Sequence, residues 1–282
     1  MSLFAAETRI VRDQAGRSVR VPANPRRVVA LAPSVTEIVF ALKQESRLVG
    51  ATQFSDYPPE ADRLPKVGSY IRLDLEKITA LGPDLCIAVK DGNPVDVVSR
   101  LEMLNIPVYA VDPRSLDTVM AAILSIGDLL NAAEAASSMV ADMKGRVSRI
   151  RQLASGAKER PGVFFQIGVS PIVSVGTPTF LHELIESAGG RNLAAGDTPY
   201  PRFSREQVLA LAPEILIITS MARGELFQKV KEEWMGWREL PAVRNRRVHI
   251  LDSDVLDRPG PRMADGLAQL FDIIHPDLAG KY

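Results

Sequence analysis

Short apolar runs alternate with helical patterns along almost the whole chain. The apolar runs read as buried strands over residues 27–34, 48–53, 84–89, 108–112, 163–169, 214–220 and 247–252. Between them, residues 36–42, 75–81, 94–104, 116–130, 180–188, 205–211 and 262–274 have helical patterns. Continuous apolar strands that alternate with helices are typical of parallel sheets covered on both faces. The pattern therefore predicts an α/β fold.

One stretch breaks this alternation. Residues 132–157 contain no proline, and Ala135, Met139, Asp142 and Arg146 recur at helical spacing. We expect one long helix of about six or seven turns, given 3.6 residues per turn. It would join two lobes, which divides the chain into an N-terminal hairpin (1–24), an N-terminal lobe (25–131), the linking helix (132–158) and a C-terminal lobe (159–282).

An internal repeat supports two similar lobes. Residues 75–88 line up with residues 205–218, so that Glu76 matches Glu206 at an offset of 130. Each copy is a short helix, stopped by a proline, that enters a buried strand. The sequence thus predicts two α/β lobes with parallel sheets, joined by a rigid helix. Ligands preferentially bind between domains, and we expect a ligand cleft between the lobes.

Composition narrows the function classes. Lys plus Arg and Asp plus Glu both total 34, so the net charge is zero. Nucleic-acid-binding proteins usually carry a basic stripe, and we expect no nucleic-acid partner. The lone cysteine, Cys86, lies in an apolar run and reads as core. It leaves the redox compartment undecided.

The residues offer little chemistry. His182, His249 and His275 are scattered without the spacing of a metal site. No nucleophile elbow, Walker loop or GxGxxG motif stands at a strand–helix junction. Ser34 and Thr36 read as a capping turn rather than as a catalytic serine site. We therefore expect a binding protein with no protein-bound metal or cofactor, and not an enzyme.

Several residues are not explained by core packing. Phe54, Tyr70 and Tyr200 lie in predicted loops, where they could present flat faces to a ligand or pack over their own lobes. Glu76 and Glu206 stand in first helical turns, which the helix dipole favours. Their symmetric placement also suits docking onto a two-fold partner.

Four segments carry a family resemblance. They are Ser-Asp-Tyr-Pro-Pro at 55–59, Phe-Gln-Ile-Gly at 165–168, the Tyr-Pro-x-x-Ser-Arg-Glu-Gln segment from residue 200, and Pro-Arg at 261–262. In this order they resemble the periplasmic binding proteins that serve ABC importers of vitamin B12, ferric siderophores and haem. The vitamin B12 binders are the most similar, over about residues 26–275, and the paired segments at 9–22 resemble the family's opening hairpin.

The resemblance implies roles for matched positions. Glu76 and Glu206 match the acids that pair with arginines of the permease dimer. The expected ligand contacts are Phe54, Tyr70, Lys90, Asn93, Tyr200, Asp254, Asp257 and Arg258. The aromatic residues would line the cleft, Lys90, Asn93 and Arg258 would meet amide or phosphate groups, and residues 254–258 would touch a corrin ring.

The chain also departs from the family pattern. Val89, Ile167, Val255 and Leu256 stand where vitamin B12 binders have aromatic residues. The ligand could therefore be a cobamide, a cobinamide or a ferric siderophore. Haem normally requires a tyrosine or histidine ligand, which Tyr57, Tyr70 or Tyr200 could supply. No matched position offers an axial metal ligand, so we expect the chelate to keep its own coordination.

The resemblance implies an extracytoplasmic protein that delivers a corrinoid to an ABC permease dimer with ATPase subunits, and that is monomeric when free. A ferric siderophore or haem is the alternative ligand. A metal chelatase or a glycosyltransferase is the rival from another class. The resemblance also implies a signal sequence removed upstream, with residues 1–3 as an expression leader.

Overall fold

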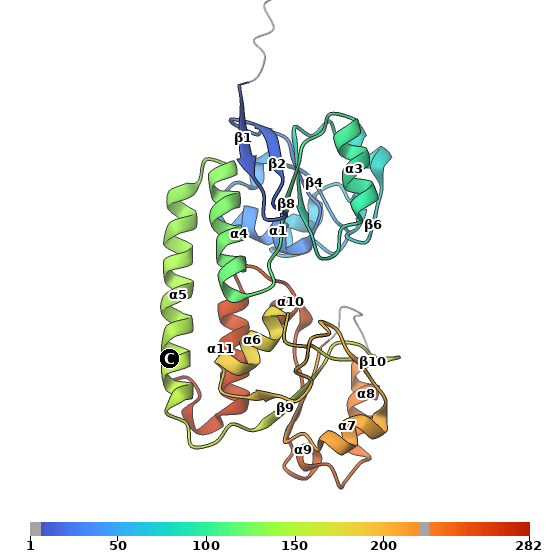
Figure 1. Cartoon of the computed structure of the whole chain (residues 1–282), viewed down its shortest axis with the longest axis vertical. Helices are drawn as coiled ribbons and strands as arrows, with labels where there is room; N and C mark the ends of the chain where they lie inside the picture. Colours follow the sequence, from blue (N-terminus) through green and yellow to red (C-terminus); the bar gives the residue numbers. More distant parts are fainter. Residues whose placement is uncertain (1–6, 220–225) are drawn as a thin grey trace, which may run out of the picture. The chain divides into compact units, whose positions relative to one another are not determined.

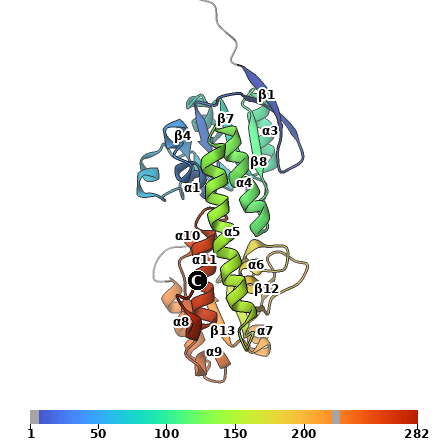
Figure 2. The ribbon, with the colours of Figure 1, turned by 90° about the vertical axis from the view of Figure 1, so that its left-hand side faces the viewer.

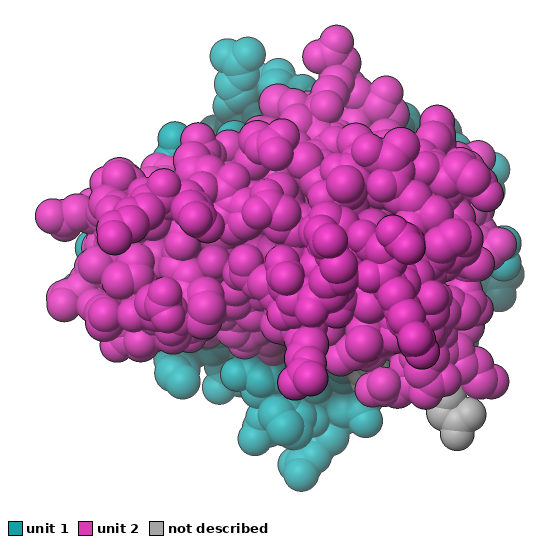
Figure 3. Space-filling view, turned by 90° about the horizontal axis from the view of Figure 1, so that it is seen from below, with its two compact units in different colours: residues 1–113, 117–141 teal, residues 114–116, 142–282 magenta. Residues whose placement is uncertain are grey.

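The computed structural model describes residues 7–219 and 226–282. The predicted leader at residues 1–3 lies outside the described residues, as does the last residue of the strand predicted over 214–220. The chain forms two compact units, coloured separately in Figure 3. Unit 1 comprises Met1–Pro113 and Asp117–Ala141, and unit 2 comprises Arg114–Leu116 and Asp142–Tyr282.

Unit 1 is built on a four-stranded parallel sheet, which confirms the predicted architecture (Figure 1). Its strands are β3 (Val28–Ala30), β4 (Leu48–Ala51), β7 (Leu85–Val89) and β8 (Val108–Val111), in the order β4-β3-β7-β8. Its helices include α1 (Pro33–Ala41), α2 (Leu75–Ala80) and α3 (Val95–Met103). Val29 and Cys86 pack against Ile78 of α2 and Leu101 of α3, so the thiol is part of the core.

An N-terminal hairpin protects one edge of this sheet. Strands β1 (Thr8–Arg12) and β2 (Ser18–Pro22) pair antiparallel, as the sequence predicts for residues 9–22. In the turn between them, the Gln14 N–H donates to the Ala110 carbonyl at 3.0 Å, and Arg17 donates to the Val108 carbonyl at 3.0 Å. The turn therefore covers β8, whose exposed backbone groups would otherwise invite pairing with another chain.

Unit 2 contains a second four-stranded parallel sheet. Its strands are β9 (Gly162–Gln166), β11 (Arg191–Asn192), β13 (Ile215–Ile218) and β14 (Val248–Ile250), in the order β11-β9-β13-β14. Its helices include α6 (Phe180–Ser187), α7 (Arg205–Leu211), α8 (Leu226–Met235), α9 (Pro241–Arg244), α10 (Ser253–Leu256) and α11 (Met263–Ile274). Phe164 and Leu216 pack with Val208 of α7 and Trp234 of α8.

The predicted long helix is α5 (Ala133–Ser155), with 23 residues, and it follows α4 (Leu116–Leu129). Helix α4 and the first part of α5 lie side by side in unit 1, as both views show (Figures 1 and 2). A Cβ on Gly127 of α4 would lie only 2.4 Å from the Ala136 Cβ, so a glycine is needed for this close approach. The boundary between the units falls inside α5, after Ala141.

The capping turn predicted at Ser34 and Thr36 is wrong. Helix α1 begins at Pro33, and its N-cap is Ala32, which makes no side-chain capping bond. Proline is favoured at the first helical position because it lacks an N–H that would need a partner. Thr36 lies inside the helix and bonds to Ser55. The sequence pattern also missed β11 and the helices α8, α9 and α10.

Two small antiparallel strand pairs extend the internal repeat. They are β5 (Gly68–Ser69) with β6 (Arg72–Leu73), and β10 (Ile172–Val173) with β12 (Arg202–Phe203). Strands β6 and β12 coincide at the offset of 130 residues, and so do Tyr70 and Tyr200. The N-caps coincide as well, because Asp74 accepts from the Lys77 N–H at 3.1 Å and Ser204 from the Gln207 N–H at 3.2 Å.

Short 3-10 turns complete the regular structure at Glu45–Arg47, Pro59–Arg63 and Pro276–Leu278. Among the described residues, no helix combines the length and the apolar character that crossing a membrane requires.

Candidate functional site

The carboxyl ends of the unit 1 strands carry most of the predicted contacts of that unit. Lys90 follows β7 directly, and Asp112 follows β8. The Lys90 Nζ lies 3.1 Å from the Asp112 Oδ2, and Lys90 is exposed. Ligands of open parallel sheets bind outside the carboxyl ends of the strands. This edge is therefore the candidate site of unit 1.

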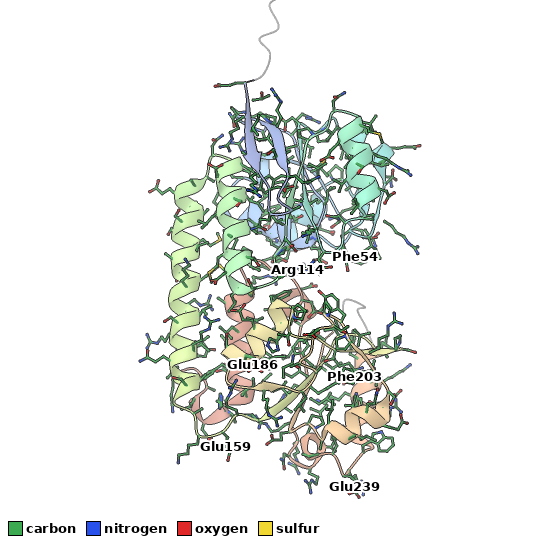
Figure 4. The ribbon with its side chains drawn as sticks, viewed as in Figure 1. Phe54, Arg114, Glu159, Glu186, Phe203 and Glu239 are labelled. Atoms are coloured by element: carbon green, nitrogen blue, oxygen red, sulfur yellow. The ribbon has the colours of Figure 1, made fainter. Side chains whose placement is uncertain are left out.

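Phe54 stands on a loop that a buried hydroxyl cluster holds in place. It follows β4 and is 38% exposed, and Figure 4 shows it at the border of its unit. The neighbouring Ser55 hydroxyl lies 2.9 Å from the Thr36 hydroxyl and 3.0 Å from the Thr52 hydroxyl. Lys66 donates to the Ser55 carbonyl at 2.8 Å. The loop is thus fixed on several sides while the phenyl ring stays accessible.

Tyr70 occupies the turn between β5 and β6 and is half-buried. Its ring packs on Gly92, where a Cβ would lie 2.9 Å from both Cδ2 and Cε2 of the tyrosine. Gly92 also has φ of +142°, a backbone conformation that side chains rarely adopt. Glycine is therefore required at position 92 for two reasons, and one of them is the position of the Tyr70 ring.

Asn93 is buried, and its amide is bonded within the protein. The side-chain oxygen accepts from the Val89 N–H at 2.7 Å. The side-chain nitrogen donates to the carbonyls of Leu31 and Tyr70, both at 2.8 Å. The sequence predicts that this amide meets the ligand, and in the structure its hydrogen bonds go to the backbone of Leu31, Tyr70 and Val89.

Tyr200 is the counterpart of Tyr70 in unit 2, and it is 44% exposed. It precedes β12, between Pro199 and Pro201. The Pro199 carbonyl accepts from the Gly176 N–H at 2.8 Å, and the Pro201 carbonyl accepts from the Ser174 N–H at 3.0 Å. Backbone bonds on both sides therefore hold this tyrosine.

The predicted acidic loop of unit 2 follows β14 and includes α10. Arg258 is only 8% exposed, and its guanidinium lies 2.7 Å from the Asp254 carboxylate. Arg262 donates to the Asp254 carbonyl at 2.8 Å. The structure thus brings Asp254 and Arg258 together as an ion pair.

Asp257 lies beside this pair, next to Thr219 at the end of β13. The Thr219 hydroxyl lies 3.1 and 3.2 Å from the two carboxylate oxygens of Asp257. Burial raises the pKa of Asp257 to about 7, and the nearby charges of Asp254 and Asp252 act in the same direction. The carboxyl group of Asp257 is therefore poised to change its protonation near neutral pH.

The two predicted docking acids occupy equivalent, exposed positions. Glu76 stands in the first turn of α2 and Glu206 in the first turn of α7. A hydrogen bond from the Ser204 side chain lowers the pKa of Glu206. The capping box of Ser204 and Gln207 is present as predicted, so each acid is held on a defined helix start.

No group of three or more His, Cys, Asp or Glu side chains within residues 7–219 and 226–282 could hold a metal ion. Burial raises the pKa of the Cys86 thiol to about 12, and burial lowers the pKa values of His249 and His275. His182 Nδ1 faces the Asn192 amide nitrogen at 3.1 Å.

The residues that hold Phe54, Tyr70 and Asp257 in place were not predicted from the sequence. These are Thr36, Ser55 and Lys66 under Phe54, Gly92 under Tyr70, and Thr219 beside Asp257. The Gly92-Asn93 pair, separated by two residues from the end of a buried strand, was a usable signal, because glycine and asparagine favour tight turns. The hydroxyl cluster gave no such signal, since its members meet only through the fold.

Comparisons with known proteins agree with this architecture. Residues 28–255 match the model of a family described as periplasmic binding protein. An ABC transporter substrate-binding lipoprotein of Bacillus subtilis, described as uncharacterized, is 31% identical over 271 residues, covering 94% of this chain and 85% of its own. The vitamin B12-binding protein of Vibrio cholerae is 32% identical over 254 residues, covering 88% of this chain and 89% of its own.

Solved structures show the same fold. A crystal structure of the periplasmic vitamin B12-binding protein of Vibrio cholerae superposes with a TM-score of 0.80 at 30% identity, covering 93% of this chain and 100% of that one. A periplasmic haem-binding protein of Pseudomonas aeruginosa gives a TM-score of 0.81 at 30% identity, covering 89% of this chain and 93% of that one. The relatives that match are binding proteins rather than enzymes.

Proposed function

The chain belongs to the periplasmic binding protein family, and we propose that it binds a corrinoid and delivers it to an ABC importer. In this proposal the protein works outside the cytoplasm, as a monomer when free. The permease dimer and its ATPase subunits supply the passage and the energy. The protein itself contributes recognition and no covalent chemistry.

The observation that carries the proposal is the repeated tyrosine. Tyr70 and Tyr200 occupy equivalent positions in the two units, each on a rigid turn ahead of the helix that carries an exposed acid. Phe54 adds a further accessible ring in unit 1. Rigid aromatic side chains provide large contact area at a low entropy cost. Such faces suit a broad, planar macrocycle.

The charged candidates favour a neutral ligand. Lys90 is paired with Asp112, and Arg258 is paired with Asp254. An anionic ferric siderophore would have to compete with these carboxylates for the cations. The amide groups of a corrinoid can instead donate to the carboxylates and accept from the cations of intact pairs. A cobalamin-type ligand therefore suits these ion pairs better than a siderophore does.

Haem is the second candidate, because a haem-binding protein is among the structures with the same fold. It would need an oxygen or nitrogen ligand to its iron. Tyr57 and Tyr200 are 43% and 44% exposed, and Tyr70 is half-buried. Replacement of these tyrosines by phenylalanine separates the two ligands, since it removes an iron ligand while keeping the aromatic face.

Glu76 and Glu206 are proposed to dock onto the permease. Both are exposed, and each is fixed on the first turn of its helix. A two-fold permease dimer would present one basic site to each acid. The equivalent setting of the two acids supports this role.

The test is calorimetric titration of the purified protein with cyanocobalamin, with haem and a ferric hydroxamate siderophore titrated in parallel. We expect saturable one-to-one binding of cyanocobalamin at micromolar affinity or tighter, on the order of 8 kcal/mol of binding free energy. Binding of the siderophore or haem instead would keep the transport role and replace the ligand. Failure to bind any of the three would overturn the proposed function.

A further inference from the structure

The three hydrogen bonds of Asn93 join the segments that form the unit 1 edge. Leu31 follows β3, Val89 ends β7, and Tyr70 lies in the turn between β5 and β6. With Asn93 only 6% exposed, these bonds are largely shielded from water. One side chain therefore sets the positions of three backbone segments relative to each other.

The place of Asn93 in the sheet is significant. From β3 the chain moves to β4 on one side, and it then returns to place β7 on the other side of β3. In open parallel sheets, the point where the strand order reverses is where ligands bind. Asn93 bridges the carboxyl ends of β3 and β7 at this point, and it connects both to the Tyr70 turn.

Gly92 constrains the side chain of Tyr70, while Asn93 constrains its backbone. The amide of Asn93 holds the Tyr70 carbonyl, while the ring of Tyr70 packs on Gly92. Backbone and ring are therefore both constrained by two consecutive residues. A tyrosine whose turn is already ordered loses less entropy when it binds a ligand.

We propose that Asn93 is a positioning residue that holds Tyr70 in its ligand-binding conformation, and that Gly92 provides the surface on which the Tyr70 ring packs. This inference rests on the proposed function, since it assigns the way in which the same site is organised. It assigns Asn93 a role that acts through Tyr70, in addition to the direct ligand contact that the sequence predicts.

The first test is affinity for cyanocobalamin in a double-mutant cycle. Asn93→Ala is measured in the wild-type protein, in Tyr70→Ala and in Tyr200→Ala. We expect affinity to fall about 3- to 10-fold in the wild type and in Tyr200→Ala, the loss associated with ordering one side chain and its turn on binding. In Tyr70→Ala the same change should cost less than about twofold.

Tyr200→Ala is the matched control, because it removes the equivalent aromatic residue of the other unit and leaves the Asn93 bonds intact. An equal loss in all three backgrounds would show that Asn93 acts through general stability, and it would overturn the inference. An unchanged wild-type affinity after Asn93→Ala would also overturn it.

The second test needs no ligand. The protein has 5 tyrosines, so fluorine NMR of protein labelled with 3-fluorotyrosine gives few signals, and Tyr70→Phe identifies that of Tyr70. Asn93→Ala and Gly92→Ala should each move the Tyr70 signal and leave the Tyr200 signal in place. An unmoved Tyr70 signal would refute the positioning role even if cyanocobalamin binds. A moved signal in a protein that binds none of the three ligands would refute the proposed function and keep the positioning role.

Discussion

Units 1 and 2 hold equivalent tyrosines by different means. Tyr70 depends on a side chain from elsewhere in the chain, the Asn93 amide, and on the packing of its ring on Gly92. Tyr200 depends on its own neighbours, because the carbonyls of Pro199 and Pro201 pair with the backbone of residues 174–176. The two strand pairs differ in connectivity, since β5 and β6 form a hairpin while α6 and β11 lie between β10 and β12, yet both leave a tyrosine at the same place in the repeat. The two units therefore share the position of the aromatic residue, but different contacts hold it in each unit.

The electrostatic surroundings of the two edges differ as well. In unit 1 an exposed lysine pairs with one aspartate after β8. In unit 2 the loop after β14 carries Asp252, Asp254 and Asp257 with the nearly buried Arg258. The unit 2 edge thus contains an acid whose pKa is raised to about 7. We expect the pH response of the protein to originate in unit 2.

The largest effect should come from the acids that the two units share. Glu76→Arg combined with Glu206→Arg should abolish import, because each reversal places like charges in contact at the permease. Each single reversal should weaken permease binding by roughly tenfold or more. Import into cells or vesicles is the measurement, and cyanocobalamin affinity, which should stay within about twofold, is the control. Loss of ligand affinity in the double variant would argue against a docking role.

Truncation of the two tyrosines compares the units directly. Tyr70→Ala and Tyr200→Ala should each weaken cyanocobalamin binding by about 10- to 100-fold, equivalent to about 1–3 kcal/mol, because each removes a rigid aromatic contact. Titration calorimetry measures the loss. Tyr70→Phe and Tyr200→Phe are the matched controls and should bind almost normally. A severe loss of cyanocobalamin affinity in either phenylalanine variant would show that the phenol oxygen makes the contact, and it would contradict the expected role of the aromatic face.

Asp257 should make the stability of unit 2 depend on pH. Its pKa is raised from 3.8 to about 7 by folding, so the folded state binds the proton more tightly than the unfolded state. The free energy of unfolding should therefore fall as the pH rises from about 4 to about 7, and level off above that. Asp257→Asn should remove this slope, on the order of 4 kcal/mol in total.

Two spectroscopic probes separate the units in this experiment. Trp234 and Trp237 are the 2 tryptophans of the chain, and both belong to unit 2. Cys86 is buried in unit 1, so the rate of its labelling by a thiol reagent reports opening of that unit. The difference between wild type and Asp257→Asn should appear in tryptophan fluorescence. If wild type and Asp257→Asn differ only in the rate of Cys86 labelling, Asp257 does not control the pH dependence of unit 2.

The smallest effect should come from the prolines beside Tyr200. Pro201→Gly keeps the carbonyl that accepts from Ser174 but gives the turn more freedom before binding. We expect cyanocobalamin affinity to fall by about 2- to 5-fold, since such changes cost roughly 0.4–1 kcal/mol. The cyanocobalamin affinity of Pro201→Ala should lie between those of the wild type and Pro201→Gly. An effect larger than that of Tyr200→Ala would mean that the proline itself contacts the ligand.

Much of the fold could be read from the sequence because the core strands are continuous apolar runs. The seven strands predicted from apolar runs are all present, although each is shorter than its run and β3 has only three residues. The edge strand β11 was missed, since it has two residues and only one of them is buried. Helix α8 was missed because it buries a narrow stripe that includes Val230 and Trp234.

The sequence by itself determined the repeat, the long helix and the exposed residues of the candidate site. These features depend on local pattern: periodicity, capping and the spacing of turn residues. It placed Phe54, Tyr70, Tyr200, Glu76 and Glu206 on loops or helix starts, and the structure leaves Phe54, Tyr200 and both acids exposed and Tyr70 half-buried.

Only the tertiary structure decided which residues hold the aromatic side chains of the candidate site in place. Asn93 reads as one polar residue in a loop, and its three partners lie 4, 23 and 62 positions away. The hydroxyls of Thr36 and Ser55 are 19 positions apart and meet only when α1 packs beside the loop after β4. Hydrogen bonds between distant segments leave no periodic trace in a sequence, because their partners are brought together by the packing of the whole unit.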